Sequence, residues 1–241
     1  MSYQENPYRS PVDVFAAQAA ASERAGFILK TYLHLAGAIL AFALLTGLIL
    51  QMPGVGNLVA AMIANRISWL LVMVCFIGAA YVAERWANSA ADPAMQYLGL
   101  GLYVVVEALI FTPILYIASD PRFGGPNIIP SAGLATLALF GVMTAVVFVT
   151  RHDFSFLRSV LMFGAFAALG LIVVAIAFGF ALGPIFTYAM IALACGYILY
   201  DTSNVLHHYR IGQHVGASLA LFASVMLLFW YILRLFLSRR D

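Results

Sequence analysis

Three ionisable side chains stand inside long apolar stretches of this sequence, where a charge is costly enough to suggest a function. Glu107 lies in LYVVVEALIFTP, six residues before Pro113, which can bend a helix and free a carbonyl oxygen. Asp201 lies in CGYILYDTSN, and His34 lies in TYLHLAG. A carboxyl group in such a place could belong to an ion path, or it could be a protonated side chain that bonds a neighbouring helix.

A stripe of polar and small residues shares the helical face of Asp201. At helical spacing this face also carries Thr187, Ala194, Tyr197, Asn204 and His208. The other faces carry Ile, Leu and Val, so we expect the stripe to point into a helix bundle or toward a water-filled cavity. The alternative is an interfacial Asp201 near the end of its helix, held by Asn204 or by an adjacent arginine.

The histidines lack the spacing of a metal site. His34 is interpreted as a structural histidine whose ring nitrogens have hydrogen-bond partners. His207, His208 and His214 fall in a short segment with Arg210, and we interpret this segment as a solvated loop. The sequence therefore predicts no cofactor.

The residue patterns also exclude several membrane proteins with known chemistry. Lys30 is the only lysine, so the chain lacks the lysine in the last helix that a retinal Schiff base needs. The sequence has neither a nucleophilic serine in a Gly-rich turn with a partner histidine nor a pair of membrane aspartates with a GxGD motif. We therefore expect no enzymatic activity.

Composition indicates that lipid is the main solvent of this chain. Hydrophobic residues make up 64% of the 241 residues and charged residues only 9%, whereas soluble domains are roughly 45–50% apolar. The net charge of +2 comes from thinly spread basic residues, which excludes nucleic acid as a partner. Cys75 and Cys195 lie in apolar runs without CxxC spacing, so we interpret them as packing residues.

Seven apolar segments are long enough to cross a bilayer core, which takes about 20 helical residues. They cover residues 27–50, 67–83, 95–118, 128–150, 154–180, 184–206 and 215–237. Gly179, Gly183 and Pro184 divide the fifth segment from the sixth, and a continuous helix there would give six spans instead. We predict an all-α membrane protein, a bundle of seven transmembrane helices in residues 27–241 that follows a polar tail in residues 1–26.

Basic residues favour an N-terminus on the cytoplasmic side of the membrane. The cytoplasmic side would then carry seven of them, Arg9, Arg24, Lys30, Arg85, Arg151, Arg158 and Arg210. The opposite side would carry five, Arg66, Arg122, Arg234, Arg239 and Arg240. No basic stretch leads into an early apolar core, as a signal peptide requires. We expect a bacterial inner membrane, with an organelle membrane as the alternative.

The sixth span and its flank, GPIFTYAMIALACGYILYDTSNVLHHY, closely resemble the signature of the Bax inhibitor family, also called the transmembrane Bax inhibitor motif family. FILKTYLHLAGAILAFAL is similar to its first span, VVVEALIFTPIL to its third, and TAVVFVTRHDFSFLRSVLMFGAFAALG to its fourth-to-fifth junction. The resemblance implies a seven-helix fold with six helices around a central one, and a pH-sensitive leak of calcium across the membrane.

In the family, an aspartate of the sixth helix shares a proton with one in the last helix, and the pair senses pH. The resemblance gives Asp201 the first position, whereas Ser224 stands at the second aspartate and Leu227 at the asparagine that usually follows. A serine supplies a hydrogen bond without the repulsion between two carboxylates. It also offers less charge to calcium, which needs several oxygens. We expect a weaker and differently pH-tuned leak, or a member that no longer conducts ions.

Three hypotheses follow for the function. The first is an ion leak for calcium or protons, in which Asp201 is the protonation-sensitive site and the candidate calcium ligand. The residues that line or close its path would be Tyr197, Asn204, Ser224 and Glu107. The second is a non-conducting modulator of a membrane-anchored ATP-dependent protease, contacted through residues 1–24. In the third, the polar residues only hold helices together.

Overall fold

A computed structural model of the chain describes residues 14–89, 92–123 and 125–238. Within these residues, seven helices are long and apolar enough to cross a membrane, which confirms the predicted bundle. They are α1 (Ala21–Gln51), α3 (Arg66–Ala87), α4 (Pro93–Ser119), α5 (Ile128–Thr150), α6 (Leu157–Phe178), α7 (Pro184–His207) and α8 (His214–Ser238). The chain is therefore a multi-pass membrane protein.

The boundary between α6 and α7 decides the count of seven over six. Gly179 has a φ of 76° and ends α6 in the left-handed conformation, with its N–H donating to Ala175 O at 2.8 Å. Pro184 then begins α7, at a position where a helix needs no N–H donor. Glycine and proline thus break the apolar run as the sequence predicted.

Two short helices were not predicted, α2 (Val55–Ile63) and the 3-10 helix Ala16–Gln18. In addition, α1 begins at Ala21 rather than at residue 27. Hydropathy finds only the part of a helix that crosses the hydrocarbon core, and it excluded Glu23 and Arg24 although the helix continues through both.

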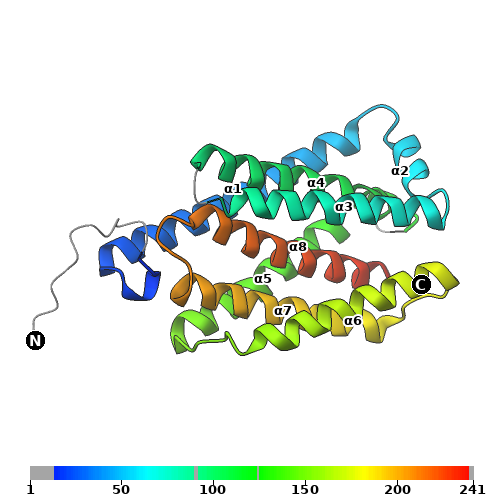
Figure 1. Cartoon of the computed structure of the whole chain (residues 1–241). Helices are drawn as coiled ribbons and strands as arrows, with labels where there is room; N and C mark the ends of the chain where they lie inside the picture. The colour runs from blue at the N-terminus through cyan, green and yellow to red at the C-terminus, as the bar shows by residue number, and fades with distance from the viewer. Residues whose placement is uncertain (1–13, 90–91, 124, 239–241) are drawn as a thin grey trace, which may run out of the picture.

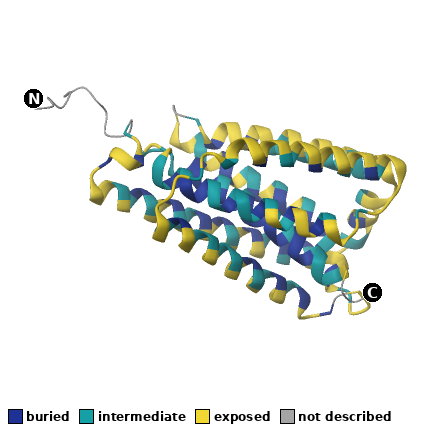
Figure 2. Ribbon diagram, turned by 90° about the horizontal axis from the view of Figure 1, so that it is seen from below, coloured by how far each residue is buried: buried dark blue, intermediate teal, exposed yellow. Residues whose placement is uncertain are grey.

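The last span, α8, is the centre of the bundle (Figure 1), with α1, α3 and α4 on one side and α5, α6 and α7 on the other. It packs against α1, α3, α4, α5 and α7, whereas α6 reaches the bundle through α7 and α3. Buried residues follow α8 on all its faces, as expected of a helix that is apolar all round (Figure 2). The central helix implied by the resemblance is thus α8.

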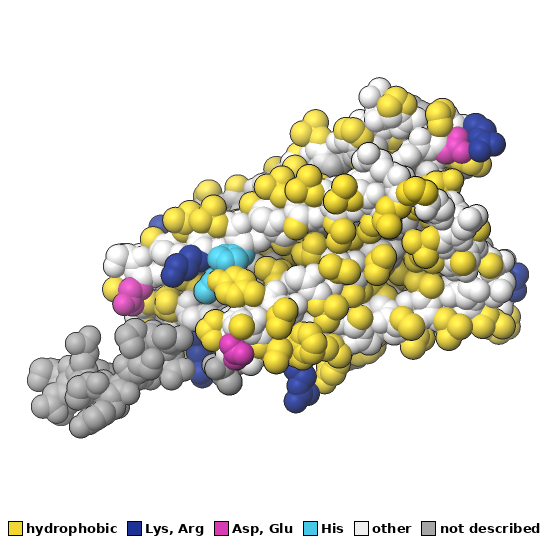
Figure 3. Space-filling view, turned by 90° about the horizontal axis from the view of Figure 1, so that it is seen from above, with side chains coloured by type: hydrophobic (Ala, Val, Ile, Leu, Met, Phe, Trp, Pro, Cys, Tyr) yellow, Lys and Arg dark blue, Asp and Glu magenta, His cyan; other side chains and the backbone are white. Residues whose placement is uncertain are grey.

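The outer helices turn large apolar side chains away from the bundle. Leu71, Val149 and Phe163 are 60%, 82% and 71% exposed, respectively. Hydrophobic side chains cover the length of the molecule, and charged ones gather toward its two ends (Figure 3). An apolar surface of this kind is stable in lipid rather than in water.

Residues just before α1 pair with the connection between α7 and α8. Ala16 donates its N–H to Tyr209 O at 2.9 Å, and Ile211 donates its N–H to Val14 O at 3.1 Å. Part of the predicted polar tail therefore contacts the bundle. Residues 1–13, most of the segment assigned to a protease contact, lie outside the described residues.

Candidate ion site and its cavity

Asp201 lies inside the bundle, where α7 faces the central helix. Its side chain is buried, and its Oδ2 accepts a hydrogen bond of 2.5 Å from Ser224 Oγ. Ser224 is buried too, so within the described part of the chain the Asp201 carboxylate accepts its side-chain hydrogen bond from α8. Asp201 is thus joined to α8 rather than to Asn204 or an arginine.

A cavity of about 960 Å³ lies between α3, α4, α6, α7 and α8. Glu107, Tyr197 and Ser224 all line it, although they come from three different helices. Glu107 is only 5% exposed, so its carboxyl group is buried in the wall of this cavity. Asp201 does not line the cavity itself but reaches it through its bond to Ser224. Four of the five predicted site residues therefore lie in or beside one cavity.

The other contacts of these residues are local. Tyr103, one turn before Glu107 on α4, interacts with its carboxyl group. Tyr197 donates its hydroxyl hydrogen to Leu161 O at 3.2 Å and so connects α7 to α6. Among the described residues, no hydrogen bond joins the Asn204 side chain to Asp201. Asn204 is therefore the predicted site residue that neither bonds the carboxylate nor lines the cavity.

Two arginines line the far end of the cavity. Arg234 donates from Nη2 to Leu182 O at 2.8 Å, and Arg66 donates from Nη1 to Ala177 O at 3.5 Å. On α8, Arg234 is ten residues beyond Ser224, which is about 15 Å of helix. Sequence analysis counted both arginines only as markers of orientation. Because arginines are common near the ends of spans, their presence in the sequence did not indicate that they line a cavity.

The acidic residues do not form a tight metal site. Calcium takes roughly 6–8 oxygen ligands, whereas Asp201 and Ser224 together offer one carboxylate and one hydroxyl. Within residues 14–89, 92–123 and 125–238, no group of three or more His, Cys, Asp or Glu side chains could hold a metal ion. This donor set is too small to complete the coordination of a calcium ion.

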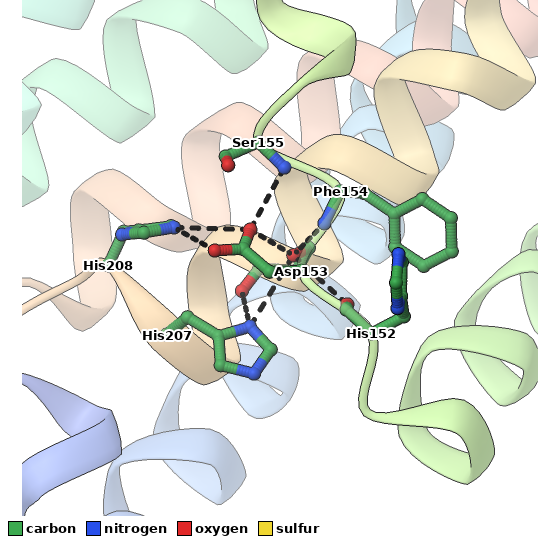
Figure 4. A network of polar contacts seen from close by, with 7 residues as sticks. His152, Asp153, Phe154, Ser155, His207 and His208 are labelled. Atoms are coloured by element: carbon green, nitrogen blue, oxygen red, sulfur yellow. Dashed lines mark hydrogen bonds and ion pairs between the residues drawn. The ribbon is translucent and has the colours of Figure 1, made fainter.

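A polar network anchors the connection between α5 and α6 to the end of α7 (Figure 4). His208 Nε2 lies 3.1 Å from Asp153 Oδ2, and the Phe154 N–H donates to Ser203 Oγ at 2.9 Å. The Ser155 N–H also bonds the Asp153 carboxylate, and this bond and His208 hold the pKa of Asp153 below its usual value. The loop interpretation of His208 missed this contact, because the partner is 55 residues away.

His207 and His214 differ from the predicted loop as well. His207 is the last residue of α7, and its Nδ1 lies 3.0 Å from Ser203 O. His214 is the first residue of α8, and its ring lies 5.0 Å from the ring of His34. His34 Nδ1 is 2.6 Å from Lys30 O, a bond within one helical turn. The solvated segment is thus shorter than predicted, since both neighbouring helices extend into it.

These features define a class of protein, a polytopic helical membrane protein with two buried carboxyl groups at one cavity, Glu107 in its wall and Asp201 beside it at the central helix. Residues 24–241 match the family described as "Inhibitor of apoptosis-promoting Bax1". The chain therefore belongs to the Bax inhibitor family, which confirms the resemblance found in the sequence.

Relatives come from eukaryotes and bacteria. Bax inhibitor 1 of Schizosaccharomyces pombe is 28% identical over 97% of this chain and 86% of that protein. A BI1-like protein of Arabidopsis thaliana is 28% identical over 88% of this chain and 80% of its own length. An uncharacterized protein of Pseudomonas aeruginosa is 26% identical over 69% of this chain and 72% of its own length.

Proposed function

We propose that this protein is a cation leak of the membrane, permeable to calcium, in which Asp201 is the protonation-sensitive site. The observation that carries the proposal is the hydrogen bond from Ser224 to Asp201, because it joins a buried carboxylate to the wall of a cavity that Glu107 also lines. Polar groups from α4, α7 and α8 thus line or adjoin one cavity whose wall is largely apolar.

Protonation of Asp201 changes what can stand beside it. An ionised carboxylate away from water is costly unless hydrogen bonds or a cation compensate its charge, and here a serine hydroxyl is its hydrogen-bond donor. A cation or water that enters from the cavity would lower this cost. The neutral acid has no such need and can donate its own proton. The two states of Asp201 therefore differ in their affinity for a cation.

A single carboxylate also suits release. With Ser224 in place of a second acid, a divalent cation meets one negative charge at this point and is held less strongly than by two. Weak binding favours passage, because an ion that binds tightly leaves slowly. We expect a slow, unsaturated leak rather than storage of calcium.

We further propose that the protein resides in a bacterial inner membrane with its N-terminus in the cytoplasm. The start of α1 and the α5–α6 connection lie at the same end of an antiparallel bundle, and this end carries the larger number of basic residues. Basic residues near the ends of spans are retained on the cytoplasmic side.

The test is calcium flux into liposomes that contain the purified protein, measured across a range of pH with a trapped calcium dye. Asp201→Asn keeps an oxygen for the Ser224 bond but cannot take up or lose the proton. It should lower flux at least about tenfold and abolish its pH dependence. Asp120→Asn, which removes a carboxylate outside the cavity, is the control and should leave flux unchanged. Wild-type flux from a folded Asp201→Asn variant would reject the proposal.

A further inference from the structure

The end of the cavity at Arg66 and Arg234 has the composition of a site for an amphiphile. We infer that it binds a long-chain fatty acid, with the carboxylate on the two guanidinium groups and the acyl chain along the apolar wall. This binding concerns the cavity of the proposed leak but does not depend on ion flow.

The two arginines have donors to spare. An arginine has five N–H donors in a planar fork that matches a carboxylate, and each of these two donates one hydrogen bond to a main-chain carbonyl. Neither forms an ion pair with a described carboxylate. The Arg66 guanidinium lies against Gly179, where a Cβ atom would come within 2.0 Å of Nη2. The site thus presents positive charge at a fixed place, with no ion pair to a carboxylate of residues 14–89, 92–123 or 125–238.

The position of these charges matches the depth of a lipid carboxylate. Arg66 is the first residue of α3, and Arg234 is four residues from the end of α8 at Ser238. Both therefore lie near the level where a span leaves the hydrocarbon core, and a fatty acid holds its carboxylate at the same interface. Charge and depth together favour an anionic lipid over a soluble anion.

The wall between the arginines and Glu107 is apolar and partly aromatic. Its members on α3, α4 and α8 are Trp69, Met73, Phe76, Ile110, Phe111 and Trp230. An inorganic anion would make no use of this wall, whereas an acyl chain finds there a surface as apolar as the lipid that it leaves. The volume of about 960 Å³ is at the upper end of the roughly 300–1,000 Å³ typical of small-molecule sites. One acyl chain is the occupant that suits both the size and the polarity.

Tryptophan fluorescence can test this directly. The chain has three tryptophans; Trp69 and Trp230 line the cavity, and Trp86 is 17 residues after Trp69 on α3, about 25 Å along the helix. The protein in phosphatidylcholine vesicles is titrated with dibromostearic acid, whose bromine atoms quench tryptophan on contact. In Trp86→Phe the remaining fluorescence comes from the two cavity tryptophans and measures binding there. In Trp69→Phe/Trp230→Phe it comes from Trp86 alone and measures quenching by bulk lipid.

We expect saturable quenching of the cavity tryptophans at mole fractions that leave Trp86 unquenched. In the Trp86→Phe background, Arg66→Gln/Arg234→Gln should raise the mole fraction for half-quenching at least about tenfold, because both carboxylate contacts are lost. Arg122→Gln is the matched control, since Arg122 is 82% exposed and already paired with Asp120, and it should have no effect.

The methyl ester of the same acid tests the head group on the unchanged arginines, so the result does not depend on whether the arginine variant folds. Weak quenching by the ester supports the site. Equal quenching by acid and ester, or quenching that rises linearly and equally for all three tryptophans, would mean simple partition into lipid and would overturn the inference. Since no ion flow is measured, a protein that leaks no calcium could still bind the acid.

Discussion

At the scale of single residues, the absence of a second acid beside Asp201 sets this chain apart from the pattern that its resemblance implies. Ser224 Oγ is within 2.5 Å of the carboxylate, so a carboxyl group at this position would share a proton with Asp201. The serine leaves Asp201 to titrate without a close acidic neighbour on α8. The pH response of the proposed leak should therefore depend strongly on this one position.

Ser224→Asp should restore the pair and shift the pH response of the leak. Two carboxyl groups in contact cannot both ionise readily, so one proton is held to higher pH. The midpoint of flux against pH should move upward, measured with the same liposomes as for Asp201→Asn. Ser224→Asn is the matched control, because it has the size of the acid without its charge, and its midpoint should stay at the wild-type value. An unchanged midpoint in Ser224→Asp would contradict a pH-sensing role for this contact.

Sequence analysis identified the buried acids but not their surroundings. Glu107 and Asp201 stand out because a carboxyl group in an apolar run is costly and rare. Ser224 was found only through the resemblance, since a serine in a span is common and gives no signal by itself. Arg66 and Arg234 were missed as cavity residues, because their shared space depends on how α3, α6 and α8 pack.

At the scale of elements, α3 and α4 cross in close backbone contact at Gly99. A Cβ atom on Gly99 would lie 2.4 Å from Ala87 N and 2.5 Å from Ala83 O, both of them backbone atoms that cannot move aside. Small residues at such crossings allow the helices to approach. Gly99 therefore holds α3, which forms one wall of the cavity, against the bundle.

Gly99→Ala should separate α3 from α4 and destabilise the protein, although alanine is the better helix former by about 1 kcal/mol. Gly101→Ala is the control on the same helix, because nothing lies within 4 Å of a Cβ atom there. Thermal unfolding in detergent should give a lower midpoint for Gly99→Ala and an equal or higher midpoint for Gly101→Ala. Equal midpoints in the two variants would mean that the crossing relaxes easily.

The network around Asp153 should contribute stability that depends on pH. Its carboxylate is favoured in the folded state, so its contribution is present above the unfolded pKa of about 3.9 and is lost as the pH falls through the folded value. Asp153→Asn should cost up to about 1 kcal/mol at pH 7, because exposed pairs are screened by water. Unfolding measured at several pH values should show the difference from wild type shrinking below about pH 4; a constant difference would argue against it.

The helices themselves were predictable because apolar length is a strong signal in a membrane protein. All seven spans were found, and the errors lay at their ends, as at Ala21 and Leu157. The short α2 was missed because nine residues are too few to cross a bilayer. The Asp153–His208 contact was missed because polar residues in a connection give no indication of their partner.

At the scale of the whole molecule, the spans fix which connections share a side of the membrane, and labelling can determine which side this is. In a background with Cys75 and Cys195 replaced by serine, Ser155→Cys marks the end with the start of α1, and Arg122→Cys marks the opposite end. In intact cells, a membrane-impermeant maleimide should label Arg122→Cys and not Ser155→Cys. The reverse pattern would place the N-terminus outside and refute the proposed orientation.

The central place of α8 has a consequence for how the protein is made. Among the seven spans, α8 is the last to leave the ribosome, yet five of the other six pack directly against it. The earlier spans must therefore be inserted in the bilayer before the helix against which they pack is present. During this interval the polar groups that later contact α8, Asp201 among them, face lipid or an insertion chaperone. Biogenesis of this protein should be more sensitive to the speed of late translation, and to quality-control proteases, than the stability of the finished bundle would suggest.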